Sequence, residues 1–272
     1  MSQTAVVTGA ASGLGYELML LLAKDSYDLV LIDIDKDKLL AIESNIIATY
    51  NTNVRSIAID LSEVNSAESV YNKIKSIPSI DVLVNCAGFG LFGSFVNTSW
   101  KRELDMLNLH IVTTTHLTKL VLQGMTDRKK GKILNVSSLA AFQPGPMMAL
   151  YYASKSYLLS FSEAIANELK DSGVSVTVLC PGPTKTSFQE VVSSNSCDNK
   201  ISFNMACPKE VAAYGYKAML KGKVVAVPGT FNKFLSNLPR LLSRKRATSI
   251  VRTIQEKNRA TSNEVKILKE VS

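Results

Sequence analysis

Seven short runs rich in Val, Ile and Leu, separated by longer segments, constrain the fold of this 272-residue chain more than any other feature. The runs are apolar on both faces, which is typical of strands buried on both sides of a parallel sheet. A repeated strand–helix alternation requires right-handed crossovers and predicts a doubly wound α/β sheet of about seven strands with helices on both faces. The predicted strands are Ala5–Thr8, Asp28–Ile32, Val54–Ile59, Val82–Val84, Lys132–Val136, Ser175–Leu179 and Val224–Val227.

Two of the intervening segments have a clear helical period. One predicted amphipathic helix has an apolar residue every three or four positions, at Leu39, Ile42, Ile46 and Tyr50. A longer predicted helix spans residues 98–125, and its expected apolar stripe is Leu104, Leu107, Ile111 and Thr115. The sequence has no internal repeat and no linker rich in Pro, Gly or Ser. We therefore expect one domain over residues 1–230, followed by a basic amphipathic C-terminal extension over residues 231–272.

The positive charge is concentrated at the C-terminal end. The whole chain has 31 basic and 23 acidic residues, a net charge of +8. Residues 217–272 contain 13 Lys or Arg and 3 Glu, a net of +10, which leaves 18 basic and 20 acidic residues, a net of −2, for residues 1–216. Since the body is nearly neutral, no nucleic-acid partner is expected. The basic amphipathic segment either packs on the body or on a second subunit, which we favour, or lies on an anionic membrane surface.

The cysteines and the chain ends indicate the compartment. Four cysteines lack the CxxC or ligand spacing of metal sites, and no metal is expected: Cys86, Cys180, Cys197 and Cys207. His110 and His116 lie six apart on one predicted helix, which is not metal-ligand spacing, so we interpret both as ordinary helix residues. The sequence has neither an apolar run of about 18 residues nor a leader pattern. Free thiols in such a chain predict a cytoplasmic protein.

A glycine-rich turn stands between the first predicted strand and the first predicted helix. Glycines there allow a tight exit from the strand, close approach of the backbone to a pyrophosphate, and close packing of helix on strand. The helix N-terminus offers N–H groups and a partial positive charge to phosphates. This context predicts a Rossmann-like dinucleotide site. The candidate residues are Gly9, Ser12, Gly13, Leu14 and Gly15.

An acidic residue, Asp33, ends the second predicted strand. A carboxylate at that position accepts hydrogen bonds from an adenosine ribose and repels a 2′-phosphate. No Arg or Lys lies inside the glycine turn, so NAD is favoured as the cofactor. Lys36 and Lys38 follow closely enough to meet a phosphate, which keeps NADP as the alternative.

Tyr151 and Lys155 are four residues apart in a predicted helix, so they share one face and reach one ligand. A free phenol has a pKa of about 10, and lowering it by ~3 units needs ~4 kcal/mol of differential interaction with a neighbour such as an ammonium. Such a tyrosine becomes a general acid/base. Ser138, just after a predicted strand, offers a hydroxyl to a carbonyl oxygen. Tyr152 is only three residues from Lys155, so Tyr151 is the favoured partner.

Together these motifs resemble the short-chain dehydrogenase/reductase family, in its single-domain branch, over residues 3–187. The glycine turn is similar to the family's TGxxxGxG, and Tyr151 with Lys155 is similar to its YxxxK. Residues 85–88 resemble its NNAG motif, with Cys86 in place of the second Asn. The resemblance implies a catalytic domain that binds NAD(P), and further cofactor contacts at Asp60, Leu61, Asn85, Ala87, Gly88, Tyr151, Lys155, Pro181, Gly182, Thr184 and Thr186.

The resemblance also implies catalytic roles. Tyr151 would exchange a proton with the substrate oxygen while a hydride passes between nicotinamide and carbon. Ser138 would orient and polarise that oxygen. Lys155 would lower the Tyr151 pKa and hold the nicotinamide ribose, and Asn108 would fix a water in the proton relay.

The expected substrate pocket is built from residues 139–150, the 89–95 loop and a lid after Thr184. Its apolar side chains favour a lipophilic alcohol or ketone, although the fold itself does not specify a substrate. They are Phe92, Pro144, Met147, Met148, Leu150 and Phe188.

Three functions remain open at this point. The favoured function is an NAD(P)-dependent alcohol dehydrogenase or carbonyl reductase, and the second is an NADPH-driven reductase of lipid metabolism. The third, a dinucleotide-binding regulatory protein without turnover, has no use for the complete Asn, Ser, Tyr and Lys set. We expect a homodimer or homotetramer.

Overall fold

A seven-stranded parallel sheet forms the centre of the computed structural model, which describes residues 3–185 and 205–270, the last of them (258–270) only as part of a helix. The strand order is β3-β2-β1-β4-β5-β6-β7, with every neighbouring pair parallel, and this confirms the predicted doubly wound fold. The strands are β1 (Thr4–Thr8), β2 (Asp28–Asp33), β3 (Val54–Ala58), β4 (Val82–Asn85), β5 (Gly131–Val136), β6 (Val174–Leu179) and β7 (Val225–Ala226).

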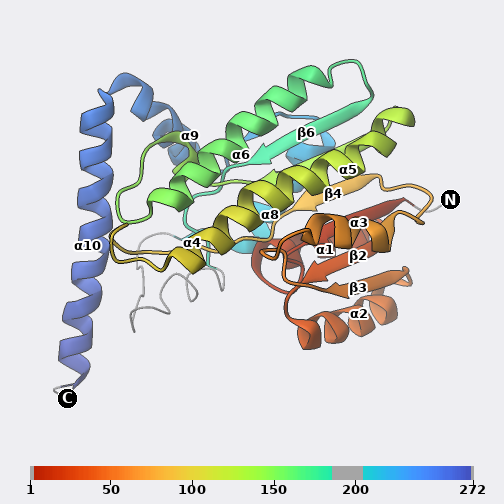
Figure 1. Ribbon diagram of the computed structural model, residues 1–272, viewed down its shortest axis with the longest axis horizontal. Coiled ribbons are helices and arrows are strands. Elements are labelled where there is room, and N and C mark those ends of the chain that lie inside the picture. Colours follow the sequence, from red (N-terminus) through yellow and green to blue (C-terminus); the bar gives the residue numbers. More distant parts are fainter. Residues whose placement is uncertain (1–2, 186–204, 271–272) are drawn as a thin grey trace.

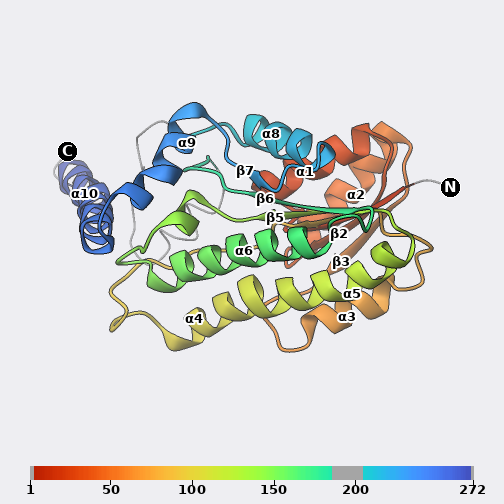
Figure 2. The ribbon, with the colours of Figure 1, turned by 90° about the horizontal axis from the view of Figure 1, so that it is seen from above.

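Helices cover both faces of the sheet (Figure 2). One face carries α1 (Gly13–Lys24), α2 (Lys36–Tyr50) and α8 (Pro208–Leu220). The other carries α3 (Ser66–Ile74), α4 (Trp100–Leu107), α5 (Thr114–Asp127) and α6 (Ala149–Glu168). The apolar runs fill two separate layers of core, because alternate residues of each buried strand point to opposite faces. In β1, Val7 joins the first layer and Val6 the second.

The long helix predicted over residues 98–125 is interrupted by a π-helical segment, Asn108–Thr113, between α4 and α5. Its predicted apolar stripe is wrong: Leu104 is 41% exposed, and the other three residues are only partly buried. The buried face instead contains Glu103, Met106, Leu109, His110 and Leu117. Leu104 lies in α4, before the π segment, so the predicted stripe is already on the wrong side there. The π segment changes the number of residues per turn only for the residues from Asn108 onward. A polar residue is tolerated on that face because Glu103 accepts a hydrogen bond from the Thr98 hydroxyl.

The strand order places β1 between β2 and β4, so the connections from β1 leave in opposite directions. Ligands of open α/β sheets bind in the crevice beyond the carboxyl ends of the strands at such a switch point. Thr8, the last residue of β1, is in register with Ile32 of β2 and Asn85 of β4. The glycine turn and the loop that follows β4 therefore start side by side.

The C-terminal segment contains α9 (Thr230–Asn237), a 3-10 turn (Leu238–Leu241) and α10 (Arg244–Glu270), which stands at one end of the molecule (Figure 1). One side of α10 is covered, since Ala247 is 3% and Val251 4% exposed. Gln255 donates a hydrogen bond of 2.8 Å to the Tyr152 hydroxyl of α6. The start of α10 therefore packs against the rest of the chain. Among the helices described, none combines the length and apolar character needed to cross a membrane.

Candidate active site

The turn between β1 and α1 is packed too closely for side chains at two of its glycines. Gly9 has a φ of +69°, and a Cβ there would lie 2.9 Å from the Ala87 Cα and N atoms. A Cβ at Gly15 would run into the carbonyl oxygen of Gly9. Gly9 needs glycine because of its left-handed backbone and its close approach to Ala87, and Gly15 because of its close approach to the Gly9 carbonyl oxygen. This cradle, as we call the turn Gly9–Gly15, is a surface made of backbone.

The N-terminus of α1 opens into the cradle. Ser12 precedes the helix in an extended conformation, and its hydroxyl does not cap the helix N–H groups. The first N–H groups of a helix lack intrahelical partners and carry a partial positive charge, a combination that binds phosphate. Gly13 and Leu14, which the sequence predicts at the phosphate site, are the first residues of α1.

Asp33 reaches the cradle from the end of β2. Its Oδ2 atom accepts a hydrogen bond of 2.9 Å from the Ala11 N–H, and Oδ1 accepts one of 3.1 Å from the Asp35 N–H. The sequence-predicted acid is therefore held against the turn. Its negative charge lies where a ribose next to the predicted phosphate site would be placed.

Thr8 is a residue of the site that sequence reasoning missed. Its hydroxyl accepts hydrogen bonds from the N–H groups of Cys86, at 3.0 Å, and Ala87, at 3.1 Å. These bonds hold the loop after β4 beside the cradle. The signal was present, because Thr8 directly precedes Gly9 in the motif.

Two residues predicted to contact the cofactor use their side chains inside the protein. Asn85 Nδ2 donates to Thr118 Oγ1 at 3.0 Å and to Asn135 Oδ1 at 2.8 Å, and so joins β4 to α5 and β5. Asp60 Oδ1 accepts from the Ser62 N–H at 2.8 Å and from the Ser62 hydroxyl at 2.6 Å. Leu61, which follows Asp60, is 6% exposed.

Ser138, Tyr151 and Lys155 come together where β5 ends against α6. The Tyr151 side chain is hydrogen-bonded to Ser138. The ammonium nitrogen of Lys155 lies 5.8 Å from the centroid of the Tyr151 ring and donates to the Val136 carbonyl oxygen at 3.1 Å. Ser137, which sequence reasoning also missed, donates its hydroxyl to the Lys155 carbonyl oxygen at 2.8 Å. These bonds fasten the N-terminal part of α6 to the end of β5.

Burial controls the titration of this group. It raises the pKa of Tyr151 to about 12, against a smaller lowering by the hydrogen bond with Ser138. Burial also lowers the pKa of Lys155 to about 8. The prediction that Lys155 lowers the Tyr151 pKa differs from this finding, because desolvation of the phenolate outweighs the other influences. The Lys155 ammonium is directed to the Val136 carbonyl oxygen.

The structure separates the two adjacent tyrosines. Tyr151 is buried next to Ser138, whereas the Tyr152 hydroxyl accepts its hydrogen bond from Gln255 of α10. The two rings meet edge to face, with centroids 6.1 Å apart. The one-residue difference turns Tyr152 toward Gly145 and the C-terminal helix.

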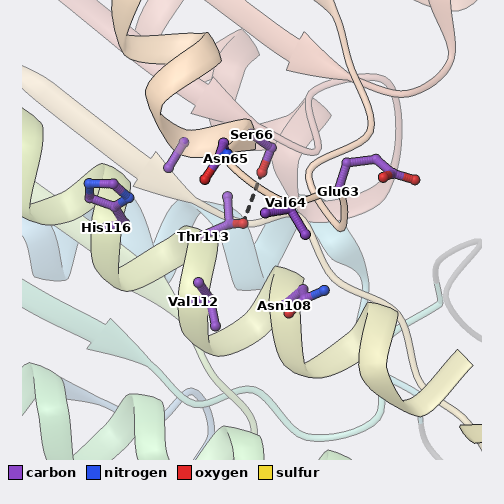
Figure 3. A pocket seen from close by; sticks show the side chains of 9 residues that line it. Glu63, Val64, Asn65, Ser66, Asn108, Val112, Thr113 and His116 are labelled. Atoms are coloured by element: carbon purple, nitrogen blue, oxygen red, sulfur yellow. Dashed lines mark hydrogen bonds between the residues drawn. The ribbon is translucent and has the colours of Figure 1, made fainter. Parts of the chain in front are cut away.

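Asn108 begins the π-helical segment and lines a cavity of about 100 Å³ (Figure 3). The other walls come from the start of α3 and the loop before it, including Glu63 and Val64, and from Val112 and His116. Ser66 and Thr113 close one side through a hydroxyl–hydroxyl hydrogen bond of 2.9 Å. Neither Ser138, Tyr151 nor Lys155 lines this cavity, so a catalytic role for Asn108 stays a prediction.

The segment after β6 approaches the same edge of the sheet. The Pro181 carbonyl oxygen accepts from the Leu139 N–H at 2.9 Å, and Thr184 donates its hydroxyl to the Gly182 carbonyl oxygen at 2.9 Å. Asn232 of α9 lies against Gly182. The predicted site residue Thr186 and the predicted lid residue Phe188 lie outside the described residues.

An apolar cluster surrounds Tyr151. Its buried members come from the loop after β4, from α4, from the turn after Ser138 and from α6, and they are Leu91, Met106, Ala140 and Tyr151. Partly buried side chains pack against them: Phe89, Met148, Leu150 and Tyr152. Two of the predicted pocket residues, Met148 and Leu150, belong to this group.

The cysteines near the site are protonated. Burial raises the pKa of both Cys86 and Cys180 to about 12, so neither is a thiolate at neutral pH. A protonated thiol is a weak nucleophile. In the part of the chain that the structure describes, no three His, Cys, Asp or Glu side chains are grouped to hold a metal ion.

Comparison with known proteins agrees with this fold. A family described as short chain dehydrogenase matches residues 3–196. The chain is 34% identical over 219 residues to hydroxysteroid dehydrogenase-like protein 1 of Gallus gallus, covering 79% of this chain and 65% of that protein. It is 33% identical over 220 residues to the very-long-chain 3-oxoacyl-CoA reductase of Mycosarcoma maydis, covering 79% and 61%. The match thus spans less than two thirds of both relatives.

Solved structures share the fold. A short-chain dehydrogenase from Sphingobium yanoikuyae in complex with NADPH superposes with a TM-score of 0.78 at 24% identity, covering 84% of this chain and 88% of that one. A short chain dehydrogenase/reductase from Burkholderia phymatum in complex with NAD gives a TM-score of 0.77 at 20% identity, covering 88% and 93%.

Proposed function

The chain belongs to the short-chain dehydrogenase family, and we propose that it transfers a hydride between a nicotinamide dinucleotide and the carbon of an alcohol or carbonyl group. The observation that carries this proposal is the meeting of Ser138, Tyr151 and Lys155 at the edge of the sheet that also bears the cradle. A hydroxyl, a phenol and an ammonium so placed can polarise a carbonyl oxygen and give it a proton.

Tyr151 acts in this proposal as the general acid. Since its pKa is raised to about 12, it is a protonated phenol at neutral pH, the form that donates a proton to a carbonyl oxygen. Ser138, hydrogen-bonded to Tyr151, holds that oxygen in line. Lys155 contributes positive charge beside the ring at neutral pH. The nicotinamide, when bound, supplies or accepts the hydride.

We favour NAD as the cofactor. Asp33 places a carboxylate on the cradle through its hydrogen bond with Ala11, and a negative charge there opposes a 2′-phosphate. The alternative, NADP, would use Lys36 or Lys38, but Lys38 is already paired with Asp35 at 2.7 Å. Of the two structural neighbours, one is in complex with NADPH and the other with NAD, so they favour neither cofactor over the other.

The proposed substrate is a lipophilic ketone or alcohol. The apolar cluster around Tyr151 supports this choice, because an apolar wall favours an apolar ligand. The relatives named as a very-long-chain 3-oxoacyl-CoA reductase and a hydroxysteroid dehydrogenase-like protein support it as well. A protonated Tyr151 is the form that serves reduction, and an NADPH-driven reductase of lipid metabolism is the second candidate.

Titration of the purified chain with NADH and with NADPH, followed by nucleotide fluorescence, tests the cofactor. We expect tighter binding of NADH; tighter binding of NADPH would favour the second candidate. A panel of long-chain 3-oxoacyl thioesters, steroid ketones and short ketones then tests turnover. Oxidation of the bound nucleotide by the lipophilic ketones is the expected result. Binding without turnover of any ketone or alcohol would favour a regulatory protein.

The C-terminal segment is proposed to contact an anionic membrane from a protein that is otherwise cytoplasmic. Burial of Ala247 and Val251 supports packing of α10 on the body, yet other apolar side chains nearby are exposed: Phe231 by 69%, Phe234 by 60% and Leu241 by 82%. Basic residues of the same segment accompany them and would attract anionic lipid: Lys233, Arg240, Arg244, Lys245 and Arg246.

Co-sedimentation with vesicles containing phosphatidylserine tests this contact. The full chain should bind, and the double substitution Phe231→Ser, Phe234→Ser should reduce binding several-fold. The control, the double substitution Val64→Ser, Val96→Ser, changes apolar residues elsewhere on the body that are at least as exposed, and it should leave vesicle binding unaltered. Equal binding by all three proteins would overturn the proposal.

A further inference from the structure

His110, interpreted from the sequence as an ordinary helix residue, is 2% exposed and lies inside the π-helical segment. Its Nε2 atom accepts the backbone N–H of Phe89 at 3.2 Å, and its Nδ1 atom lies 2.9 Å from the Ser154 hydroxyl oxygen. A backbone N–H can only donate, so Nε2 must present its lone pair. We therefore assign the neutral tautomer with the proton on Nδ1, donated to Ser154.

The hydrogen bonds continue from Ser154 to the catalytic helix. The Ser154 hydroxyl, 0% exposed, donates to the Tyr151 carbonyl oxygen at 2.8 Å. Each donor thus has one acceptor: His110 Nδ1–H donates to the Ser154 hydroxyl oxygen, and the Ser154 hydroxyl donates to the Tyr151 carbonyl oxygen. The series reaches the turn of α6 that carries both Tyr151 and Lys155.

Close packing holds the ring on its other side. A Cβ at Gly88 would lie 2.8 Å from His110 Nε2 and 3.6 Å from the Lys155 ammonium nitrogen. The His110 ring also meets the rings of Phe89 and Tyr151, with centroids 6.1 and 6.0 Å away. The imidazole therefore fills the space between the loop after β4 and α6.

We propose that His110 is a positioning residue, a clamp that holds the Gly88–Phe89 loop against the turn of α6 carrying Tyr151 and Lys155, and that it works only as the neutral Nδ1–H tautomer. The clamp deepens the proposed function, on which its catalytic consequence rests. It fixes the distance between the loop beside the cradle and the phenol that gives up the proton. Neither Phe89 nor Ser154, the two hydrogen-bond partners of His110, needs to touch substrate.

The surroundings keep the ring neutral. Burial, together with the positive charge of Lys155, lowers the pKa of His110 well below its ordinary 6.5. The titratable groups that face it are Tyr151 and Lys155, both from α6. From the loop after β4 it faces the Gly88 backbone and the N–H and ring of Phe89. A proton on Nε2 would oppose the Phe89 N–H, so protonation would open the clamp.

Two substitutions test separately the two hydrogen bonds of His110, with the Phe89 N–H and with the Ser154 hydroxyl. The amide of His110→Asn ends near the position of Nδ1 and keeps a donor for Ser154, but it cannot reach Phe89. The longer His110→Gln keeps an acceptor for Phe89 and loses the donor to Ser154. We expect His110→Asn to weaken NADH binding about tenfold with a smaller change in kcat. We expect His110→Gln to lower kcat about tenfold with an NADH Kd within about twofold of the native value, and Ser154→Ala should reproduce it.

His116→Asn is the matched control, since this histidine lies six residues further along and is partly exposed. It should alter neither Kd nor kcat. Two results would refute the clamp. In the first, both His110 variants change Kd and kcat by the same factor, and the factor follows their loss of melting temperature. In the second, neither variant changes Kd or kcat.

The pH dependence of unfolding tests the tautomer without any turnover. A neutral buried histidine takes up about one proton when the chain unfolds below pH ~6.5, so stability falls as the pH is lowered through that range. The slope of unfolding free energy against pH measures the number of protons taken up on unfolding. For native protein this number should exceed that for His110→Asn by about one, and equal slopes would refute the neutral clamp. If native protein binds neither NADH nor NADPH, the proposed function fails, while the unfolding slopes still decide the state of His110.

Discussion

The cradle after β1 and the catalytic face of α6 meet at one edge of the sheet, but they are made of different parts of the chain. In the cradle, backbone atoms form the surface, and Gly9 and Gly15 are needed because a Cβ would collide. Where β5 ends against α6, side chains form the surface, which presents the Ser138 hydroxyl, the Tyr151 phenol and the Lys155 ammonium.

This difference separates binding from chemistry. A backbone surface is lost when a methyl group is added, whereas a side-chain surface is lost when a single functional atom is removed. The first kind of change should abolish dinucleotide binding, and the second should stop turnover while binding persists.

The largest effect is expected from Tyr151→Phe. It removes the proton donor and should lower kcat by a factor of about 10²–10⁴, with the Kd for NADH unchanged, because the cradle is intact. Steady-state turnover and nucleotide fluorescence measure the two quantities. Tyr152→Phe is the matched control and should keep nearly native turnover, since Tyr152 bonds to Gln255. Loss of turnover in the control alone would reverse the assignment of the two tyrosines.

Gly15→Ala tests the backbone side of the comparison. The added methyl group meets the Gly9 carbonyl oxygen, so we expect a loss of about 1–3 kcal/mol of folding free energy together with loss of NADH binding. Gly124→Ala is the control, because its methyl group lies inside α5 and meets a side chain, Arg128 at 3.1 Å, and no backbone; the guanidinium of Arg128 is held by a hydrogen bond to the Ile80 carbonyl oxygen. There we expect native NADH affinity and a change in unfolding free energy within about 1 kcal/mol, measured by urea unfolding. Native NADH affinity in Gly15→Ala would show that the cradle is not built by close packing.

Lys155→Met tests the buried charge of the catalytic face through pH. The pKa of Lys155 is lowered to about 8 from its ordinary 10.5, so between these values the unfolded chain holds a proton that the folded chain lacks. Stability due to Lys155 therefore rises with pH in that window, by at most ~1.4 kcal/mol per pH unit. Urea unfolding between about pH 8 and pH 10 should show native protein gaining on Lys155→Met, since the variant lacks this titration. A constant difference would mean that Lys155 is not desolvated.

Asp33→Asn is expected to have the smallest effect, because it changes a side chain at the rim of the backbone surface. The amide oxygen can still accept from Ala11, but the negative charge is removed. We expect the ratio of NADPH to NADH affinity to rise by about tenfold, or ~1.4 kcal/mol. Competitive fluorescence titration measures that ratio, and an unchanged ratio would remove Asp33 as the determinant of cofactor choice.

The sequence was most informative where structure is local. Each predicted strand overlaps an observed one, because buried parallel strands are continuous apolar runs, and the cradle follows from the spacing of its glycines. The Tyr151–Lys155 pair follows from the helical period. The domain boundary at residue 230 stays a prediction.

What the sequence could not supply depends on contacts between distant segments. The long helix buries the face that contains Glu103, Met106 and His110 in place of the predicted apolar stripe, and nothing in the residue types announces this face or the π-helical segment. His110 becomes part of the site only because Phe89 and Ser154 come to it from other elements. The raised pKa of Tyr151 likewise depends on burial, which the spacing of Tyr151 and Lys155 does not reveal.

The most direct test of the central claim is transfer of isotope from NADH deuterated at nicotinamide C4 to a lipophilic ketone, followed by mass spectrometry of the alcohol. The account predicts deuterium on the carbinol carbon with native protein, and labelled alcohol formed about 10²–10⁴ times more slowly by Tyr151→Phe under conditions where both proteins are saturated with NADH. An alcohol formed equally well by Tyr151→Phe, or no labelled alcohol from native protein that binds NADH, would contradict it.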